Sequence, residues 1–112
     1  MKPLRVTGHS IACAAGIGQQ ALATALRARV SGLRPNDFSE HPLATWIGRV
    51  AGIEGVRLPD HLMEWDCRNN RLAWVALNAD GLLERAVSMR SRYGADRVAL
   101  VVYAGSSGLV LP

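Results

Sequence analysis

The run Leu72-Ala73-Trp74-Val75-Ala76-Leu77, together with the later run Val98-Ala99-Leu100-Val101-Val102, decides the fold class of this chain. The first run is apolar on every side of a helix, so the helix that contains it should be covered on more than one side. The second run is continuously apolar, which is typical of a central strand in a parallel sheet with helices on both faces. The two runs predict an α/β fold with one helix over 68–92 and a strand over 97–102.

Outside these two runs, the sequence predicts shorter elements in the order expected of alternating strands and helices. They are a β-like run at Leu4–Gly8, a helix at Gln19–Arg29 ended by Gly32, a strand at Trp46–Val50, and a helical stretch opened by Pro59 and capped by Asp60. No linker or internal repeat divides the chain, so it is treated as one unit.

Composition indicates a globular chain and excludes several classes of protein. With 112 residues, of which 49% are apolar and 20% charged, the chain has room for one domain. Twelve Arg and one Lys against nine acidic residues give a net charge of +4. These arginines are scattered along the sequence, whereas nucleic-acid binders cluster theirs, so no nucleic-acid partner is expected.

The chain contains two cysteines, which lie outside any disulfide or zinc-ligand spacing and favour a reducing compartment. Cys13 lies between a predicted strand and a predicted helix, where a helix dipole would favour a thiolate. Nothing in the sequence brings a histidine to Cys13 or to Cys67, so both are interpreted as structural residues. The histidines are His9, His41 and His61.

The N-terminal region has two features of a signal peptide, a basic start and a stretch without charge from Val6 to Leu26. Polar residues and glycines interrupt this stretch. A cytoplasmic protein without a membrane span is therefore expected.

Four further patterns have a functional and a structural interpretation. Gly16 to Ala21 matches the G-x-G-x-x-G/A dinucleotide pattern, but the first glycine does not directly follow a strand, which favours a small-residue loop before a helix. Glu64 and Arg68 have the i,i+4 spacing of an ion pair, which is simpler than a catalytic pair of carboxylates. Arg71, Asn78, Arg85 and Arg92 recur every seven residues, as a solvated stripe or as a surface for an acidic partner. The segment Gly105-Ser106-Ser107-Gly108 is a turn without the lysine of a phosphate-binding loop.

The order of several motifs resembles the amino-terminal region of β-ketoacyl-acyl carrier protein synthases over residues 4–102. The motifs are Arg5-Val6-Thr7-Gly8 with Ile11 and Gly18, Ser31-Gly32-Leu33, Gly48-Arg49-Val50-Ala51-Gly52, and Asp66-Cys67-Arg68-Asn69-Asn70-Arg71-Leu72-Ala73 leading into the long helix and Arg97–Val102. Asp66–Ala73 is the most specific of them.

The resemblance implies the amino-terminal portion of a thiolase-like α/β/α/β/α sandwich, incomplete in this chain, over residues 1–102, with a divergent tail at 103–112. It also implies a decarboxylative condensation of acyl and malonyl thioesters, an acyl carrier protein as partner, and a homodimeric parent enzyme. The family's nucleophilic cysteine and two histidines lie beyond the matched region. We therefore assign no catalytic, cofactor-binding or metal-ligating residue to this chain, and Cys13 does not inherit the nucleophile's role.

This interpretation predicts a chain that is inactive by itself. The alternative is a small, free-standing α/β binding or interaction module. A third reading, a small dinucleotide-binding domain, depends on the Gly16 loop alone.

Overall fold

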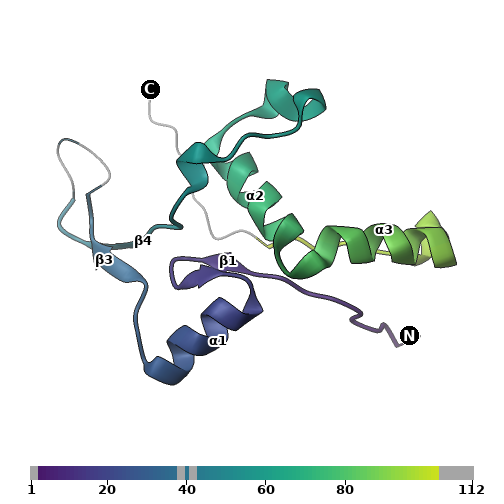
Figure 1. Cartoon of the computed structure of the whole chain (residues 1–112), viewed down its shortest axis with the longest axis horizontal. Coiled ribbons are helices and arrows are strands. Elements are labelled where there is room, and N and C mark those ends of the chain that lie inside the picture. The colour runs from purple at the N-terminus through teal and green to yellow at the C-terminus, as the bar shows by residue number, and fades with distance from the viewer. Residues whose placement is uncertain (1–2, 38–39, 41–42, 104–112) are drawn as a thin grey trace.

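A computed structural model of the chain describes residues 3–37, 40 and 43–103. It is a mixed α/β structure, as predicted, in which helices connected by 3-10 turns lie beside short strands (Figure 1). The α-helices are α1 (Gln19–Ala28), α2 (Arg68–Asn78) and α3 (Leu82–Tyr93). The 3-10 turns are η1 (Ile53–Gly55), η2 (Asp60–Trp65), η3 (Ala79–Gly81) and η4 (Ala95–Arg97).

The strands of the described residues form two small antiparallel sheets rather than a parallel one. In the first sheet, β1 (Ala12–Cys13) pairs with β2 (Gly16–Ile17), and Cys13 lies opposite Gly16. In the second, β3 (Leu33–Pro35) pairs with β4 (Trp46–Gly48). The strand predicted over 46–50 is thus confirmed at its start, and the expectation of a parallel sheet is not met in the described part of the chain.

The first helix matches its prediction, but its end differs. Arg29, in the left-handed region at φ 54°, ends α1, so Gly32 is not the terminating residue. Gly32 instead lies against the turn between β1 and β2. A Cβ placed on Gly32 would lie 2.4 Å from the carbonyl carbon of Ala14, so only glycine allows this close approach.

The single long helix predicted over 68–92 is broken into α2 and α3. Asp80 at φ 56° and Gly81 at φ 67° both adopt left-handed conformations, and the two helices meet there at a sharp angle (Figure 1). The apolar periodicity of the sequence continues through this point, which is why the sequence predicted one helix. An Asp-Gly pair is a recognised turn signal that the periodicity outweighed in that prediction.

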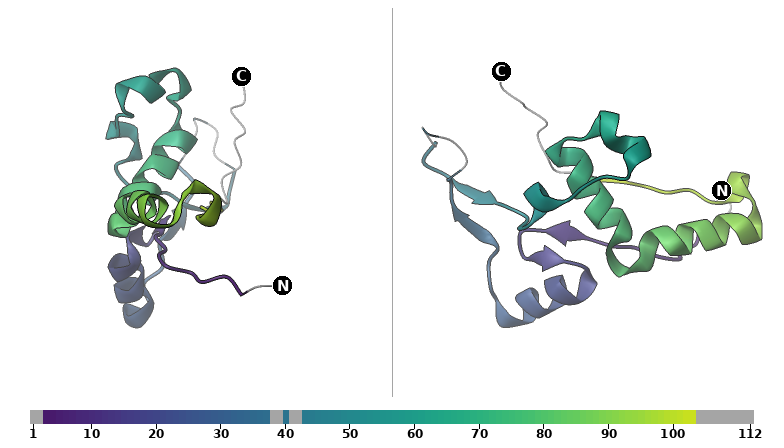
Figure 2. Two further views of the ribbon diagram at one scale, coloured as in Figure 1. Left: turned by 90° about the vertical axis from the view of Figure 1, so that its right-hand side faces the viewer. Right: turned by 45° about the horizontal axis from the view of Figure 1, so that its top comes forward.

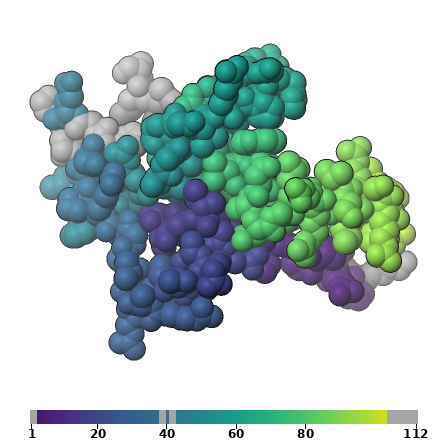
Figure 3. Space-filling model, viewed as in Figure 1, coloured from purple at the N-terminus to yellow at the C-terminus, as the bar shows by residue number. Residues whose placement is uncertain are grey.

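The core of the described residues is small and lies around η1. Val50, Ile53 and Leu58 are buried, and the Ile53 side chain is 0% exposed. The radius of gyration is 16.6 Å, against about 13 Å for a compact domain of this length. Figures 2 and 3 show the reason, since α1, the β3–β4 hairpin and α3 project in different directions from a narrow centre.

Two segments that the sequence predicts as strands form no hydrogen-bonded ladder with a neighbouring strand in the described structure. Residues 4–8 and 98–102 pair with no strand among the residues that the structure describes. Leu4 is 96% exposed and Val101 is 90% exposed. Both predictions of a strand are therefore wrong for this structure, because no neighbouring strand lies beside either segment. Of the predicted tail at 103–112, Tyr103 alone is described, and the turn predicted at 105–108 lies outside the described residues.

Candidate functional site

The densest group of polar contacts lies where η1 meets the start of α2. We call it the α2 base and define it as Arg49, Glu54, Asp66, Arg68 and Arg71. Arg71 binds the Asp66 carboxylate with two parallel hydrogen bonds, from Nε to Oδ1 at 2.6 Å and from Nη2 to Oδ2 at 2.5 Å. The remaining nitrogen, Nη1, donates to the backbone carbonyl of Glu54 at 3.0 Å. Arg71 therefore fastens α2 to the turn that carries the buried Ile53.

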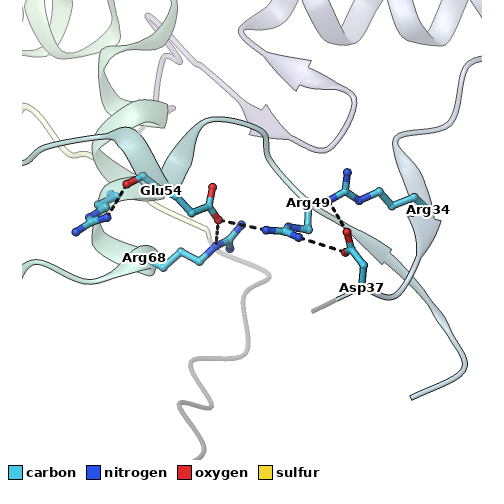
Figure 4. Close-up of polar contacts among 6 residues, drawn as sticks. Arg34, Asp37, Arg49, Glu54 and Arg68 are labelled. Carbon is cyan, nitrogen blue, oxygen red and sulfur yellow. Dashed lines mark hydrogen bonds and ion pairs between the residues drawn. The ribbon is translucent and has the colours of Figure 1, made fainter. Parts of the chain in front are cut away.

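Opposite charges alternate across the α2 base and continue to the β3–β4 hairpin (Figure 4). Glu54 Oε1 accepts a hydrogen bond from Arg68 Nε at 3.1 Å and lies 3.6 Å from Arg49 Nη2. The Asp37 carboxylate is 3.2 Å from Arg49 Nη1 and 3.2 Å from Arg34 Nη2. This row of ion pairs links the hairpin, η1 and α2, which are separate in the sequence.

The charges at the α2 base hold both of its carboxyl groups in the ionised form. A backbone hydrogen bond at Glu54, followed by the hydrogen bond from Arg68, lowers the pKa of Glu54 below its ordinary value. The Arg71 hydrogen bonds lower the pKa of Asp66, and Asp66 in turn raises the pKa of Arg71. A general acid must be protonated at working pH, so neither carboxyl suits that role. The contacts of the α2 base join η1 to α2.

The predicted pairs around this cluster need correction. Arg68 bonds Glu54, whereas Glu64 accepts a hydrogen bond from Trp65 Nε1 at 3.0 Å. The i,i+4 rule fails here because Glu64 lies in η2 and α2 begins only at Arg68. Asp60 does not cap η2 with its side chain, since Pro59 is the capping residue and Asp60 pairs with Arg57 at 3.3 Å.

The glycine-containing loop before α1 binds a carboxylate of the chain itself. The backbone N–H of Gln19, the first residue of α1, donates to both Asp80 oxygens, at 3.2 and 3.0 Å. A pyrophosphate bound in the dinucleotide manner would occupy this helix N-terminus, where Asp80 already places negative charge. A Cβ on Gly16 would lie 2.6 Å from the Ala21 Cβ, so Gly16 serves the packing of the loop on its own helix. The geometry favours the small-residue loop.

The cysteines and histidines do not converge within the described residues. Cys13 lies in β1 of a hairpin rather than between a strand and a helix, which corrects its predicted position. It is half-buried, and Cys67 is exposed just before α2. Neither thiol bonds a histidine in the part of the chain that the structure describes; His9 and His61 are exposed, and His41 lies outside that part.

The predicted arginine stripe does not form one surface. Arg71 points to Asp66 and η1, Arg85 donates to the backbone carbonyl of Thr7 at 3.1 Å, and Arg92 lies 5.2 Å from the centre of the Tyr93 ring. The bend between α2 and α3 separates these side chains.

The described surface contains a cleft and a groove. A cleft of about 350 Å³ lies between the N-terminal segment and the α2–α3 joint. It is lined by Val6, Thr7, Gly8, His9, Gln19, Asp80, Leu82 and Arg85. A shallower groove of about 160 Å³ runs between η2 and α2, and its walls are largely apolar. The residues that line the groove are Leu58, Leu62, Trp65, Asn70, Ala73, Trp74 and Leu77.

The sequence did not indicate the contacts of Asp80, Glu54 and Arg49, each of which joins two separate elements. The Asp80-Gly81 turn signal was available, but no local pattern indicates that Asp80 reaches a residue 61 positions away. Among the described residues, no three His, Cys, Asp or Glu side chains gather in a way that could hold a metal ion. None of the described helices has the length and apolar character needed to cross a membrane.

Comparison with known proteins adds no assignment. The chain matches no protein-family model, no curated protein sequence and no solved structure.

Proposed function

We propose that this chain is the amino-terminal portion of a β-ketoacyl-acyl carrier protein synthase-like condensing enzyme with a thiolase-like fold. In this role it supplies strands and the central helix and leaves the nucleophile to other residues. An acyl carrier protein as partner, a homodimeric parent and a cytoplasmic location follow from the same family. The chain alone is then inactive in condensation.

The observation that carries the proposal is the exposure of the two runs that the resemblance assigns to strands. Leu100, Val101 and Val102 are all exposed, although they form a continuous apolar run without a charged residue. Leu4 and Val6 in the first run are also exposed. Burial of apolar surface stabilises a structure by roughly 25 cal/mol per Å² removed from water. These runs therefore favour a larger structure in which neighbouring strands and helices cover them.

The central helix supports the same proposal. Each residue from Arg71 to Leu77 is half-buried, so every side of α2 is partly covered and no side is fully covered. A helix that is apolar all round is stable where it lies between two layers. The position expected from the family, between two sheets, would complete this cover.

The alternative is a small binding module, and the apolar groove between η2 and α2 favours it. Trp65 is 62% exposed at the rim of this groove, and exposed tryptophans are frequent anchors of interfaces. A module would bind its partner with the chain as it stands, whereas the condensing-enzyme proposal requires further residues.

The test is to read the nucleotide sequence that follows the codon for Pro112 in all three forward frames. The proposal expects, in one frame, a cysteine at a strand-to-helix turn followed by two well-separated histidines. The absence of such residues in every frame would overturn the proposal and leave the binding module. As a biochemical check, the purified chain should release no carbon dioxide from a malonyl-carrier protein thioester.

A further inference from the structure

The joint between α2 and α3 interrupts a helical pattern that the sequence carries without a break. The apolar stripe keeps helical spacing on both sides of η3. Its members are Leu72, Val75, Ala76, Ala79, Leu83, Ala86 and Val87. In the structure, two consecutive left-handed residues, Asp80 and Gly81, bend the chain at this point (Figure 1). A continuous helix would keep this stripe on one face, and the bent form divides it.

Hydrogen bonds with distant residues hold the joint and the first turn of α3. The Asp80 carboxylate accepts from the Gln19 backbone N–H with both oxygens, and Gln19 Nε2 donates to the His9 carbonyl at 2.8 Å. Arg85, in the first turn of α3, donates to the Thr7 carbonyl. The bent joint therefore depends on contacts with the start of α1 and the N-terminal segment, and Asp80 makes the contact that lies on the joint itself.

The local chemistry of the joint permits either conformation. Aspartate tolerates the left-handed region better than most residues, and glycine adopts it without penalty. A Cβ on Gly81 would meet no heavy atom within 4 Å, so no packing contact requires glycine there. A continuous helix would gain backbone hydrogen bonds across the joint, and the bent form gains the Asp80 cap on α1.

We propose that the Ala79–Gly81 joint is a two-state hinge, held bent by the Asp80 carboxylate that caps α1, and that α2 and α3 become one continuous helix when this cap is released. This inference does not rest on the proposed function. If the hinge straightens, the cleft beside Asp80 and the angle between α2 and α3 change together.

The experiment measures the distance between two spin labels by pulsed electron paramagnetic resonance. The first label is attached to the native Cys67, which is exposed. The second label is attached to a cysteine introduced by Arg90→Cys, and Cys13→Ala removes the remaining native thiol. A continuous helix separates the two backbone positions by about 34 Å, and the bent form gives a clearly shorter distance. The deciding variant is Gln19→Pro, which removes the donor N–H to Asp80. Proline is tolerated at the first position of a helix, and residues 79–81 remain unchanged.

The proposal expects a short distance in the parent chain and a shift of most of the population toward about 34 Å in Gln19→Pro. Gln19→Ala is the matched control; it removes the Gln19 side chain, keeps the backbone donor and should keep the short distance. A Gln19→Pro distance equal to that of the parent would overturn the proposal, as would a parent chain already at the long distance. If Gln19→Pro loses its helical circular dichroism, Gly81→Ala decides. A longer distance in that variant supports the hinge, and an unchanged distance overturns it.

Discussion

The α2 base and the segment 98–103 differ in charge, in burial and in the neighbours that they contact. At the α2 base, Glu54 of η1 pairs with Arg68 of α2, and Asp66 pairs with Arg71 of α2, close in the chain to the fully buried Ile53. The segment 98–103 is more apolar, but Tyr103 at its end is 94% exposed and the segment belongs to no sheet. Apolar character predicts burial only where another surface of matching shape is present, and the α2 base has such a surface.

The largest effect on the free energy of unfolding is expected when apolar side chains of the two regions are shortened to alanine. Ile53→Ala should lower the free energy of unfolding by about 3 kcal/mol, because a cavity would replace a fully buried side chain. Val101→Ala, at an exposed position, should change it by less than about 0.5 kcal/mol. Urea denaturation followed by circular dichroism measures both values. Equal losses would contradict the assignment of the core to η1.

A somewhat smaller effect tests the contact between the two hairpins. Gly32→Ala should destabilise the chain by about 2 kcal/mol, because its Cβ would overlap the Ala14–Ala15 backbone, which has little freedom to move. Gly55→Ala is the matched control, since nothing lies within 4 Å of its Cβ position. The same denaturation measurement applies, and an unaffected Gly32→Ala chain would show that the hairpins do not pack in this way.

Acid should weaken the α2 base and leave the segment 98–103 unaffected. The pKa of Glu54 lies below its ordinary value of 4.5 and that of Asp66 below 3.8, so their ion pairs favour folding above these values. This contribution is lost as the pH falls through the folded-state pKa of each group. In an acid titration followed by circular dichroism, Asp66→Asn should reduce the loss of stability below about pH 4. Asp60→Asn, at an exposed pair with Arg57, should follow the parent curve.

The smallest effect on stability, but a clear effect on association, is expected from Val101→Lys. A lysine at this exposed position removes no buried contact, so the free energy of unfolding should change by less than about 0.5 kcal/mol. A charge within an extended apolar segment opposes strand pairing with other chains. Sedimentation velocity should therefore show less self-association than in the parent. Identical association would place the contact elsewhere.

The sequence predicted α1 and the start of β4, but it did not predict β1, β2 or β3. The helix at 19–28 and the strand at 46–48 follow from residues that contact their own neighbours. The sequence did not predict the break at Asp80, because a carboxylate bound to Gln19 stabilises it from a distance. It also missed the Arg68–Glu54 pair, since the i,i+4 rule assumes one continuous helix.

The segments 4–8 and 97–102 show why the sequence predicted strands that the structure does not contain among its described residues. Their residue types favour a strand, but a strand also needs a partner that supplies backbone donors and acceptors. No local pattern identifies that partner. For the same reason, the family resemblance and the small core are compatible, because the resemblance implies neighbours that cover these segments.

The most direct test of the central claim is to titrate the purified chain with a hydrophobic dye such as anilinonaphthalene sulfonate while following its thermal unfolding. A portion of a larger condensing enzyme should bind the dye with a strong rise in fluorescence, and Val101→Lys should reduce that rise. It should also self-associate. A chain that binds no dye and stays a monomer up to its unfolding temperature would contradict the account and favour a self-contained module.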